Sequence, residues 1–251
     1  MPIAKRVEPA TISFLLTGID PLSRDDAALA MCAAITADGH GEHCRRLFDA
    51  LFKLEPRPDP EKLREAILQT HLFAGYPRTL NALAAFKDAC KKAGNPLTGE
   101  IKLREHPLEG DDMALFRKRG RELFDQVYQD KADQIDRYAR GNSPDLGDWA
   151  IVEGYGRVLG RSVLEPRVRS LCIVGALIPL DVTPQLKGHV QGALNTGSSA
   201  DQLWKLLDVC SRLFTEGTET RGAKKVFEDV LGKQIISEEE FLEDREWRGL
   251  G

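Results

Sequence analysis

The sequence lacks the features that identify several large classes of protein. No uncharged apolar run approaches the roughly 18 residues that a membrane span needs, and the segment before Asp20 is too weakly apolar for a signal peptide. The formal net charge of −4 argues against a dedicated nucleic-acid-binding protein, because neutralising phosphates requires clustered positive charge. The composition, 42% hydrophobic and 29% charged, is ordinary for a globular chain. We therefore expect a soluble cytoplasmic protein with neither nucleic-acid nor membrane partners.

Cysteine is present, but not in an arrangement typical of a redox protein. The five cysteines are odd in number and widely spaced, which argues against a disulfide framework, and no two of them form a CxxC pair. A glycine-rich phosphate loop is also absent, so the sequence indicates no nucleotide cofactor. The cysteines are Cys32, Cys44, Cys90, Cys172 and Cys210.

The hydrophobic pattern is helical along nearly the whole chain. Apolar residues recur at three- and four-residue spacing, and neither an Asn-Gly hairpin nor a convincing strand is found. Helix starts are indicated where a capping residue precedes proline, after Asp59, Ser143 and Thr183, and by a capping box from Ser199 to Gln202. We predict an all-α fold. The glycines expected to end helices are Gly75, Gly197 and Gly232.

The chain is predicted to contain two related halves. Two helical segments in the first part resemble two in the second at an offset of about 140 residues, which suggests a duplicated helical unit. Residues 95–111 are rich in helix breakers and charge and are the best candidate linker. We therefore predict a divergent first repeat over 1–94 and a second repeat over 112–251, which carries the better-matched site and a C-terminal arm.

The segment from 149 to 197 holds the best candidates for chemistry. His189 shares a helical face with Leu186 and Ala193, so its imidazole is expected to face an apolar interior, where burial and neighbouring groups tune its pKa. The alternative interpretation is a core histidine with a single hydrogen bond. Spacing alone does not separate a functional His189 from a structural one.

Charged and hydroxyl side chains precede this histidine. Arg167 and Ser170 lie on one stripe of the preceding helix, where the core is expected. Glu153, Arg157 and Arg161 follow one another at four-residue intervals, which is also the pattern of a solvated ion-pair ladder. Two glycines are interleaved with them and reduce helix propensity unless another backbone or a ligand approaches closely. They are Gly156 and Gly160.

The second half resembles the carboxymuconolactone decarboxylase family, which belongs with the alkylhydroperoxidase-like proteins. The motifs that carry the resemblance are EGYGRVLGR, RVRSL and QLKGHVQGALNTG, with His189 nineteen residues after Ser170. The likeness covers about 80 residues here and about 30 in the first half, where LREAILQTHLFAGYPRTLNALAAFKDA is similar to that family's closing helices. The resemblance implies two fused helical units and a homo-oligomer, either a dimer or a trimer.

Within that superfamily the residues favour the decarboxylase branch. The peroxidase branch carries glutamate and two cysteines where this chain has Ser170, Val182 and Gln185, so the attacking and resolving thiols are missing. The decarboxylase branch has serine and histidine at Ser170 and His189. It commonly carries glutamate where Arg157 stands, which is a departure from its pattern.

The resemblance implies a lyase that decarboxylates a small lactone or carboxylic acid without a cofactor. His189 would return a proton to carbon, Ser170 would hydrogen-bond the lactone, and Glu153 would orient His189 or an arginine. An arginine would hold the substrate carboxylate. The substrate-binding residues would be Arg167, Arg161 and Tyr155.

Other interpretations stay open at this point. An alkylhydroperoxidase-like or peroxiredoxin-like antioxidant protein could use unpaired Cys172, Cys44 or Cys210, and a non-catalytic member of the family would bind a small acid in a vestigial pocket. His40, His43 and Cys44 lie close together, as zinc ligands do, but no fourth ligand follows at a recognisable spacing. We therefore predict no metal site.

Overall fold

The computed structural model describes residues 9–94, 112–213 and 218–232, and these residues form helices and no strand, which confirms the all-α prediction. Within these ranges no helix combines the length and apolar character that crossing a membrane requires. The predicted linker, 95–111, and the predicted C-terminal arm lie outside the described residues. The elements are α2 (Pro9–Leu15), α3 (Arg24–Asp38), α4 (Gly41–Leu51), α5 (Pro60–Gln69), α6 (His71–Lys92), α7 (Asp112–Tyr128), η1 (Gln129–Lys131), α8 (Ala132–Asn142), α9 (Pro144–Trp149), η2 (Ala150–Leu159), α10 (Pro166–Leu177), η3 (Ile178–Leu180), α11 (Thr183–Asn195), α12 (Ala200–Leu213) and α13 (Thr218–Leu231).

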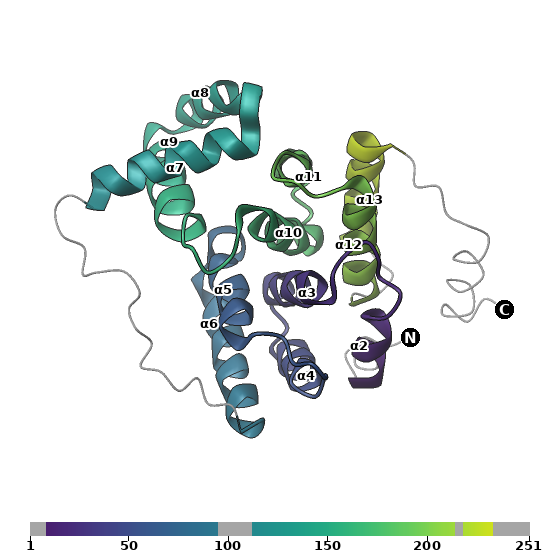
Figure 1. The fold of residues 1–251 in the computed structure, drawn as a ribbon. Helices are drawn as coiled ribbons and strands as arrows, with labels where there is room; N and C mark the ends of the chain where they lie inside the picture. The colour runs from purple at the N-terminus through teal and green to yellow at the C-terminus, as the bar shows by residue number, and fades with distance from the viewer. Residues whose placement is uncertain (1–8, 95–111, 214–217, 233–251) are drawn as a thin grey trace.

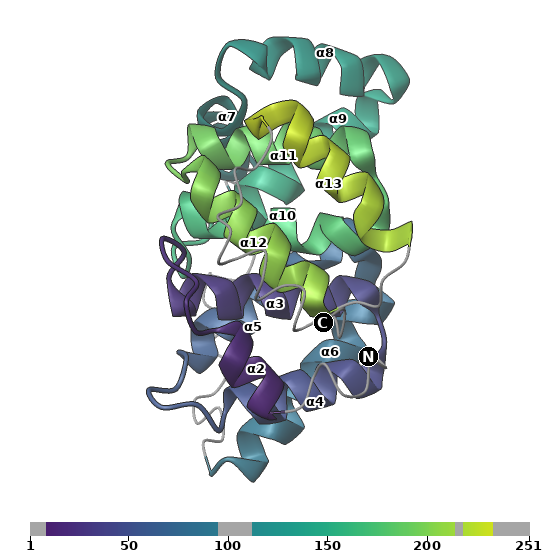
Figure 2. The same cartoon turned by 90° about the vertical axis from the view of Figure 1, so that its right-hand side faces the viewer.

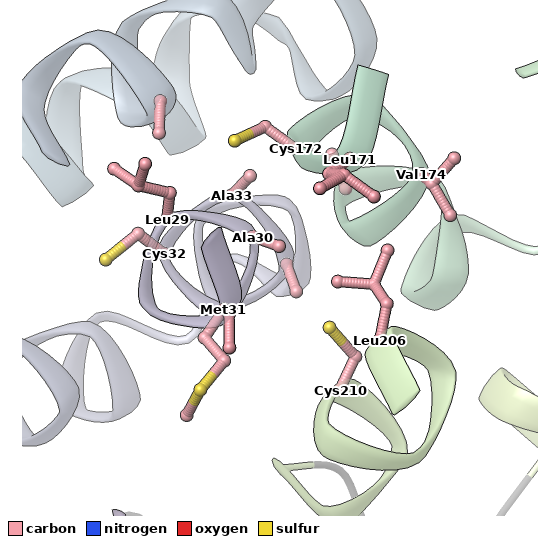
Figure 3. Close-up of a cluster of buried hydrophobic side chains, with 14 of the residues drawn as sticks. Leu29, Ala30, Met31, Cys32, Ala33, Leu171, Cys172, Val174, Leu206 and Cys210 are labelled. Carbon is pink, nitrogen blue, oxygen red and sulfur yellow. The ribbon is translucent and has the colours of Figure 1, made fainter. Parts of the chain in front are cut away.

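Two helices from distant parts of the chain, α3 and α10, lie side by side at the centre of the molecule (Figure 1). Helix α3 is rich in alanine, and a Cβ added to Gly175 of α10 would lie only 2.7 Å from the carbonyl oxygen of Ala30. Small side chains are therefore what let the two backbones approach. In Figure 3, Leu171 and Cys172 of α10 surround this contact together with Leu206 of α12. The central pair is the scaffold on which the other helices pack.

The remaining helices surround this pair in two similar sets. Helices α4, α5 and α6 follow α3, and α11, α12 and α13 follow α10; α4 packs on α6 as α11 packs on α13. Helices α7, α8 and α9 gather at one end of the molecule, and α2 and α4 lie at the other (Figure 2). This parallel order is what a duplicated unit would produce. The division into two repeats stays a prediction.

Three of the four predicted helix starts are confirmed by cap hydrogen bonds; Thr183 is instead the first residue of α11, and Val182 precedes it without a side-chain cap hydrogen bond. The side chain of Asp59 accepts a backbone N–H at 2.8 Å, and that of Ser143 accepts one at 3.2 Å. The capping box closes in both directions, because the Gln202 N–H donates to Ser199 Oγ at 3.1 Å and the Ser199 N–H donates to Gln202 Oε1 at 3.0 Å. Gly197, an expected helix end, has a φ of 104°, which favours glycine.

The helix end expected at Gly75 is a kink instead. Helix α5 already ends at Gln69, and Gly75 interrupts α6 with φ 81° and ψ 166°. Glycine adopts this positive φ without strain, and Pro77 lacks the N–H that a continuous helix would use there. The kink separates the first turn of α6 from its long second part, and the pocket described below uses that first turn.

The segment before α10 winds as a π-helix, η2, rather than as the ordinary helix that the sequence suggested. Such wide turns are often found at functional sites. Here η2 lies directly against α7: a Cβ on Gly120 would fall on the carbonyl oxygen of Ile151, and one on Gly156 would fall on that of Phe116. The close backbone approach that the sequence indicated at Gly156 is therefore present.

A buried ion cluster joins the two halves of the chain. Glu65 of α5 is 1% exposed, and its Oε1 accepts hydrogen bonds from Arg161 Nε at 2.9 Å and from Arg169 Nη2 at 2.8 Å. Arg169 also donates to the side-chain oxygen of Gln69 at 2.9 Å. Because both arginines belong to the second half, these hydrogen bonds hold α5 against the start of α10.

Candidate functional site

A pocket of about 370 Å³ lies between α11 and the group formed by α7, α8, α9 and η2. Its volume is within the range of small-molecule sites. The first turn of α6, placed by the kink at Gly75, closes one side. One lining residue from each contributing element is Phe73 of α6, Phe124 of α7, Ile135 of α8, Trp149 of α9, Ile151 of η2 and His189 of α11.

Three polar side chains meet in this largely apolar pocket. The hydroxyl of Tyr155 donates to the Tyr128 oxygen at 2.9 Å, and that oxygen lies 3.5 Å from Nε2 of His189. Aromatic rings hold them in place: Phe73 packs edge-on against His189 with 5.6 Å between centroids, and Phe124 contacts both tyrosine rings. The arrangement presents hydrogen-bonding groups on rigid walls.

None of these three groups carries a charge at neutral pH. Burial lowers the pKa of His189 to about 4. Burial also raises the pKa of the Tyr128 and Tyr155 hydroxyls above their ordinary range. His189 is therefore a neutral imidazole, with one nitrogen that donates and one that accepts. The pocket can hydrogen-bond a carbonyl or hydroxyl group, but the described residues that line it supply no fixed positive charge for an anion.

The charged side chains that reach the pocket are acidic and already paired. Glu153 Oε2 accepts from Arg157 Nη1 at 3.0 Å, the pair expected of a solvated ladder, and both side chains are more than 40% exposed. Asp136 accepts from Arg140 Nε at 2.9 Å. No arginine or lysine is among the described residues that line the pocket. A carboxylate entering it would lose water without gaining a cation.

The structure brings together half of the predicted site residues. Those that line the pocket are His189, Glu153 and Tyr155. The other three are engaged elsewhere: Arg167 Nη2 donates to Asp26 Oδ2 of α3 at 2.8 Å, Arg161 belongs to the buried ion cluster, and Ser170 Oγ accepts from the Thr196 hydroxyl at 3.1 Å. Neither arginine lines the pocket. The predicted carboxylate clamp is not assembled there.

All five cysteines are buried as free thiols. Burial raises the pKa of Cys44 and Cys210 to about 12 and that of Cys90 to about 11. Burial also raises the pKa of Cys32 and Cys172, which lie in the central core (Figure 3). Peroxide reduction requires an accessible thiolate. These cysteines are core residues, because they are neither ionised at neutral pH nor accessible.

The residues that complete the pocket from outside the 149–197 segment were not predicted from the sequence. Tyr128 supplies the hydroxyl next to His189, and Phe124, one turn earlier on α7, packs against it with 4.6 Å between ring centroids. Phe73 comes from the first half of the chain. The four-residue spacing of Phe124 and Tyr128 was the one available signal, since it places two aromatic rings on the same helical face.

Burial of His189 predicts a loss of stability in acid. Its pKa is about 4 in the folded protein and about 6.5 in an unfolded chain. The unfolded state therefore binds the additional proton as the pH falls from about 6.5 to 4, and folding weakens by up to about 3 kcal/mol from this group alone. Urea unfolding of wild type and His189→Gln between pH 7 and 4 measures this difference, because glutamine does not titrate. Parallel stability curves for the two proteins would contradict it.

Comparison with known proteins finds two similar proteins from yeasts. The chain is 32% identical over 163 residues to a protein of Schizosaccharomyces pombe named Peroxisomal protein 2, and the match covers 64% of this chain and 73% of that one. It is 29% identical over 154 residues to a protein of Saccharomyces cerevisiae with the same name, covering 54% of each. The chain thus spans about half the length of the second relative. No family model matches the chain.

These names correct several of the predictions. Both relatives are named as peroxisomal proteins, and neither is named as a decarboxylase or a peroxidase. The predicted cofactor-free lyase, its antioxidant and acid-binding alternatives and the cytoplasmic location are therefore wrong. The physical reason is that Arg161 and Arg167 pair with other residues and the thiols are buried, so the described residues give the pocket neither a carboxylate clamp nor a thiolate. The resemblance to the carboxymuconolactone decarboxylase family and the homo-oligomer stay predictions, because the names do not bear on them.

Proposed function

We propose a binding function in the peroxisome for this chain, which belongs to the Peroxisomal protein 2 family. The pocket holds a neutral, largely apolar small molecule that carries one carbonyl or hydroxyl group. His189 and Tyr128 hydrogen-bond that group, and the aromatic and aliphatic walls cover the rest of the molecule. The relatives' names support the location, and the geometry of the pocket supports the binding.

The main support for this proposal is that the polar groups in the pocket are uncharged and that its acidic side chains are already paired with arginines. The groups available for hydrogen bonding, on His189, Tyr128 and Tyr155, are uncharged at neutral pH because they are buried. The acidic side chains at the pocket, Glu153 and Asp136, each accept a hydrogen bond from an arginine on their own helix. An uncharged ligand loses little on leaving water, whereas a charged one would lose its hydration without compensation.

A fluorescent competition assay tests the binding. The neutral dye N-phenyl-1-naphthylamine is expected to brighten on binding the purified full chain. Decanol is then expected to displace it at least about tenfold more effectively than decanoate, a difference of about 1.4 kcal/mol or more in binding free energy. The two competitors have the same chain length and differ in charge. Equal displacement by decanoate would contradict a site built for neutral ligands.

Gly154 offers a matched pair of variants that locates the bound dye. Gly154 lines the pocket, and a Cβ there would meet nothing closer than the Trp149 carbonyl oxygen at 3.9 Å. Gly154→Leu therefore fills pocket space and is expected to weaken dye binding at least about tenfold, whereas Gly154→Ala is expected to change it little. Circular dichroism checks that both variants keep the helices. Unchanged binding by Gly154→Leu would place the dye elsewhere.

The location is tested separately. A fluorescent protein fused to either end of the chain in turn, and expressed in fission yeast, is expected to coincide with a peroxisomal matrix marker for at least one of the two fusions. In cells that cannot assemble peroxisomes the same fusion is expected to spread through the cytosol. Diffuse fluorescence in normal cells for both fusions would contradict a peroxisomal location, whatever the pocket binds.

A further inference from the structure

A second cluster of chemically capable side chains lies at the junction of α3 and α4. Asp38 is the last residue of α3, Gly39 turns the chain with φ 83°, and His40 is the residue before the first turn of α4. His43 follows in the first turn of α4. The tight turn thus brings one carboxylate and two imidazoles to the same place.

The three side chains converge through atoms that can ligate a metal. The Nδ1 atoms of His40 and His43 lie 2.8 and 3.4 Å from Asp38 Oδ2, and one such atom from each residue lies within 4.8 Å of the others. Zinc bonds of about 2.0–2.2 Å at tetrahedral or right angles place neighbouring ligand atoms about 3 to 3.5 Å apart. We propose that Asp38, His40 and His43 form a binding site for a divalent cation of the zinc class.

The turn that carries these ligands is held in place by its neighbours. The Gly39 N–H donates to the Ile35 carbonyl at 3.2 Å, and Arg78 of α6 donates to the Ala37 carbonyl. The hydrocarbon part of Arg78 also packs against Gly39, where an added Cβ would lie 2.9 Å from its Cδ. A cation would therefore meet positioned ligands and need not order a flexible loop.

The surroundings limit the site to three protein ligands and one open side. Glu42 accepts hydrogen bonds from two neighbouring arginines, and the Cys44 thiol donates to the Ile35 carbonyl at 3.6 Å. The side chains of Asp38 and His43 are about 15% exposed and that of His40 is 67% exposed, so the cluster opens to solvent. Two nitrogens, one carboxylate and a water suit Zn²⁺, whereas Mg²⁺ and Ca²⁺ prefer oxygen ligands throughout.

Metal titration of the full chain, freed of any purification tag, tests the proposal. Calorimetry with Zn²⁺ and visible absorption with Co²⁺ are expected to show one equivalent bound, with no displacement by excess Mg²⁺. Asp38→Asn and His40→Ala are each expected to weaken Zn²⁺ binding at least about tenfold. His71→Ala is the matched control, since His71 Nδ1 donates to the Leu68 carbonyl and lies outside the cluster. It is expected to bind as wild type does.

Two results would overturn the proposal. One is the absence of Zn²⁺ and Co²⁺ uptake by the folded wild-type chain at millimolar metal. The other is uptake that His40→Ala and Asp38→Asn leave unchanged, which would place the metal elsewhere. His40 is largely exposed, so its replacement is not expected to unfold the protein. Thermal unfolding gives a second measurement that does not rely on calorimetry: Zn²⁺ is expected to raise the melting temperature of wild type and not that of His40→Ala.

Discussion

Replacing Glu65 by alanine is expected to lower the free energy of unfolding by about 3–5 kcal/mol. The carboxylate is 1% exposed and accepts hydrogen bonds from Arg161 and Arg169. Without it the guanidinium group of Arg169, a residue only 2% exposed, stays buried with no counter-charge. Urea unfolding followed by circular dichroism measures the loss.

Glu42 provides a matched control for this prediction. It also accepts hydrogen bonds from two arginines, Arg45 and Arg46, but its side chain is 58% exposed, so Glu42→Ala is expected to change stability scarcely at all. Combining Glu65→Leu with Arg169→Met is expected to recover much of the loss, because apolar side chains of similar size need no partner. Equal losses from Glu65→Ala and Glu42→Ala would contradict the role of the buried cluster.

Adding one methyl group at Gly120 is expected to destabilise the protein by about 3 kcal/mol, at the upper end of overpacking effects. The Cβ of alanine would fall on the carbonyl oxygen of Ile151 and lie 2.9 Å from the backbone nitrogen of Gly156. Neither atom can rotate away, because both belong to the backbone of η2. Helix α7 and η2 must therefore separate, and the pocket that both helices line is expected to lose shape as well. Thermal unfolding and dye binding measure the two effects.

Gly154→Ala on the same π-helix is the control for Gly120→Ala. Its new methyl group would meet no atom closer than 3.9 Å, so the variant is expected to be as stable as wild type or up to about 1 kcal/mol more stable, because alanine favours helix over glycine. If Gly120→Ala proved as stable as Gly154→Ala, the close packing of α7 on η2 would be refuted.

The local features of the helices could be predicted from the sequence because they depend on residues a few positions apart. Asp59, Ser143 and the Ser199 box cap helices through hydrogen bonds to backbone groups two or three residues away. The apolar surroundings of His189 followed from its neighbours on one helical face. The Glu153–Arg157 ion pair is likewise local, and the four-residue spacing of the two residues predicted it.

The composition of the site could not be predicted, because its members are separated in sequence. Tyr128 lies 61 residues before His189, yet its hydroxyl is the polar group next to the imidazole. Arg161 and Arg167 pair with acidic residues 96 and 141 positions away, and these partners remove both arginines from the pocket. Helical periodicity shows which face a side chain occupies, but not which distant helix covers that face.

By itself the sequence determined that this protein is helical, where several of its helices begin and end, and that His189 faces inward. These properties come from periodicity and capping, which act over a turn or two of helix. Only the tertiary structure decided that Arg161 and Arg167 pair with carboxylates from the first half of the chain. It also decided that the first turn of the kinked α6 and the aromatic side chains of α7 close the pocket. Packing between distant helices sets the charge of a buried site, because it decides which partner each ionised group meets.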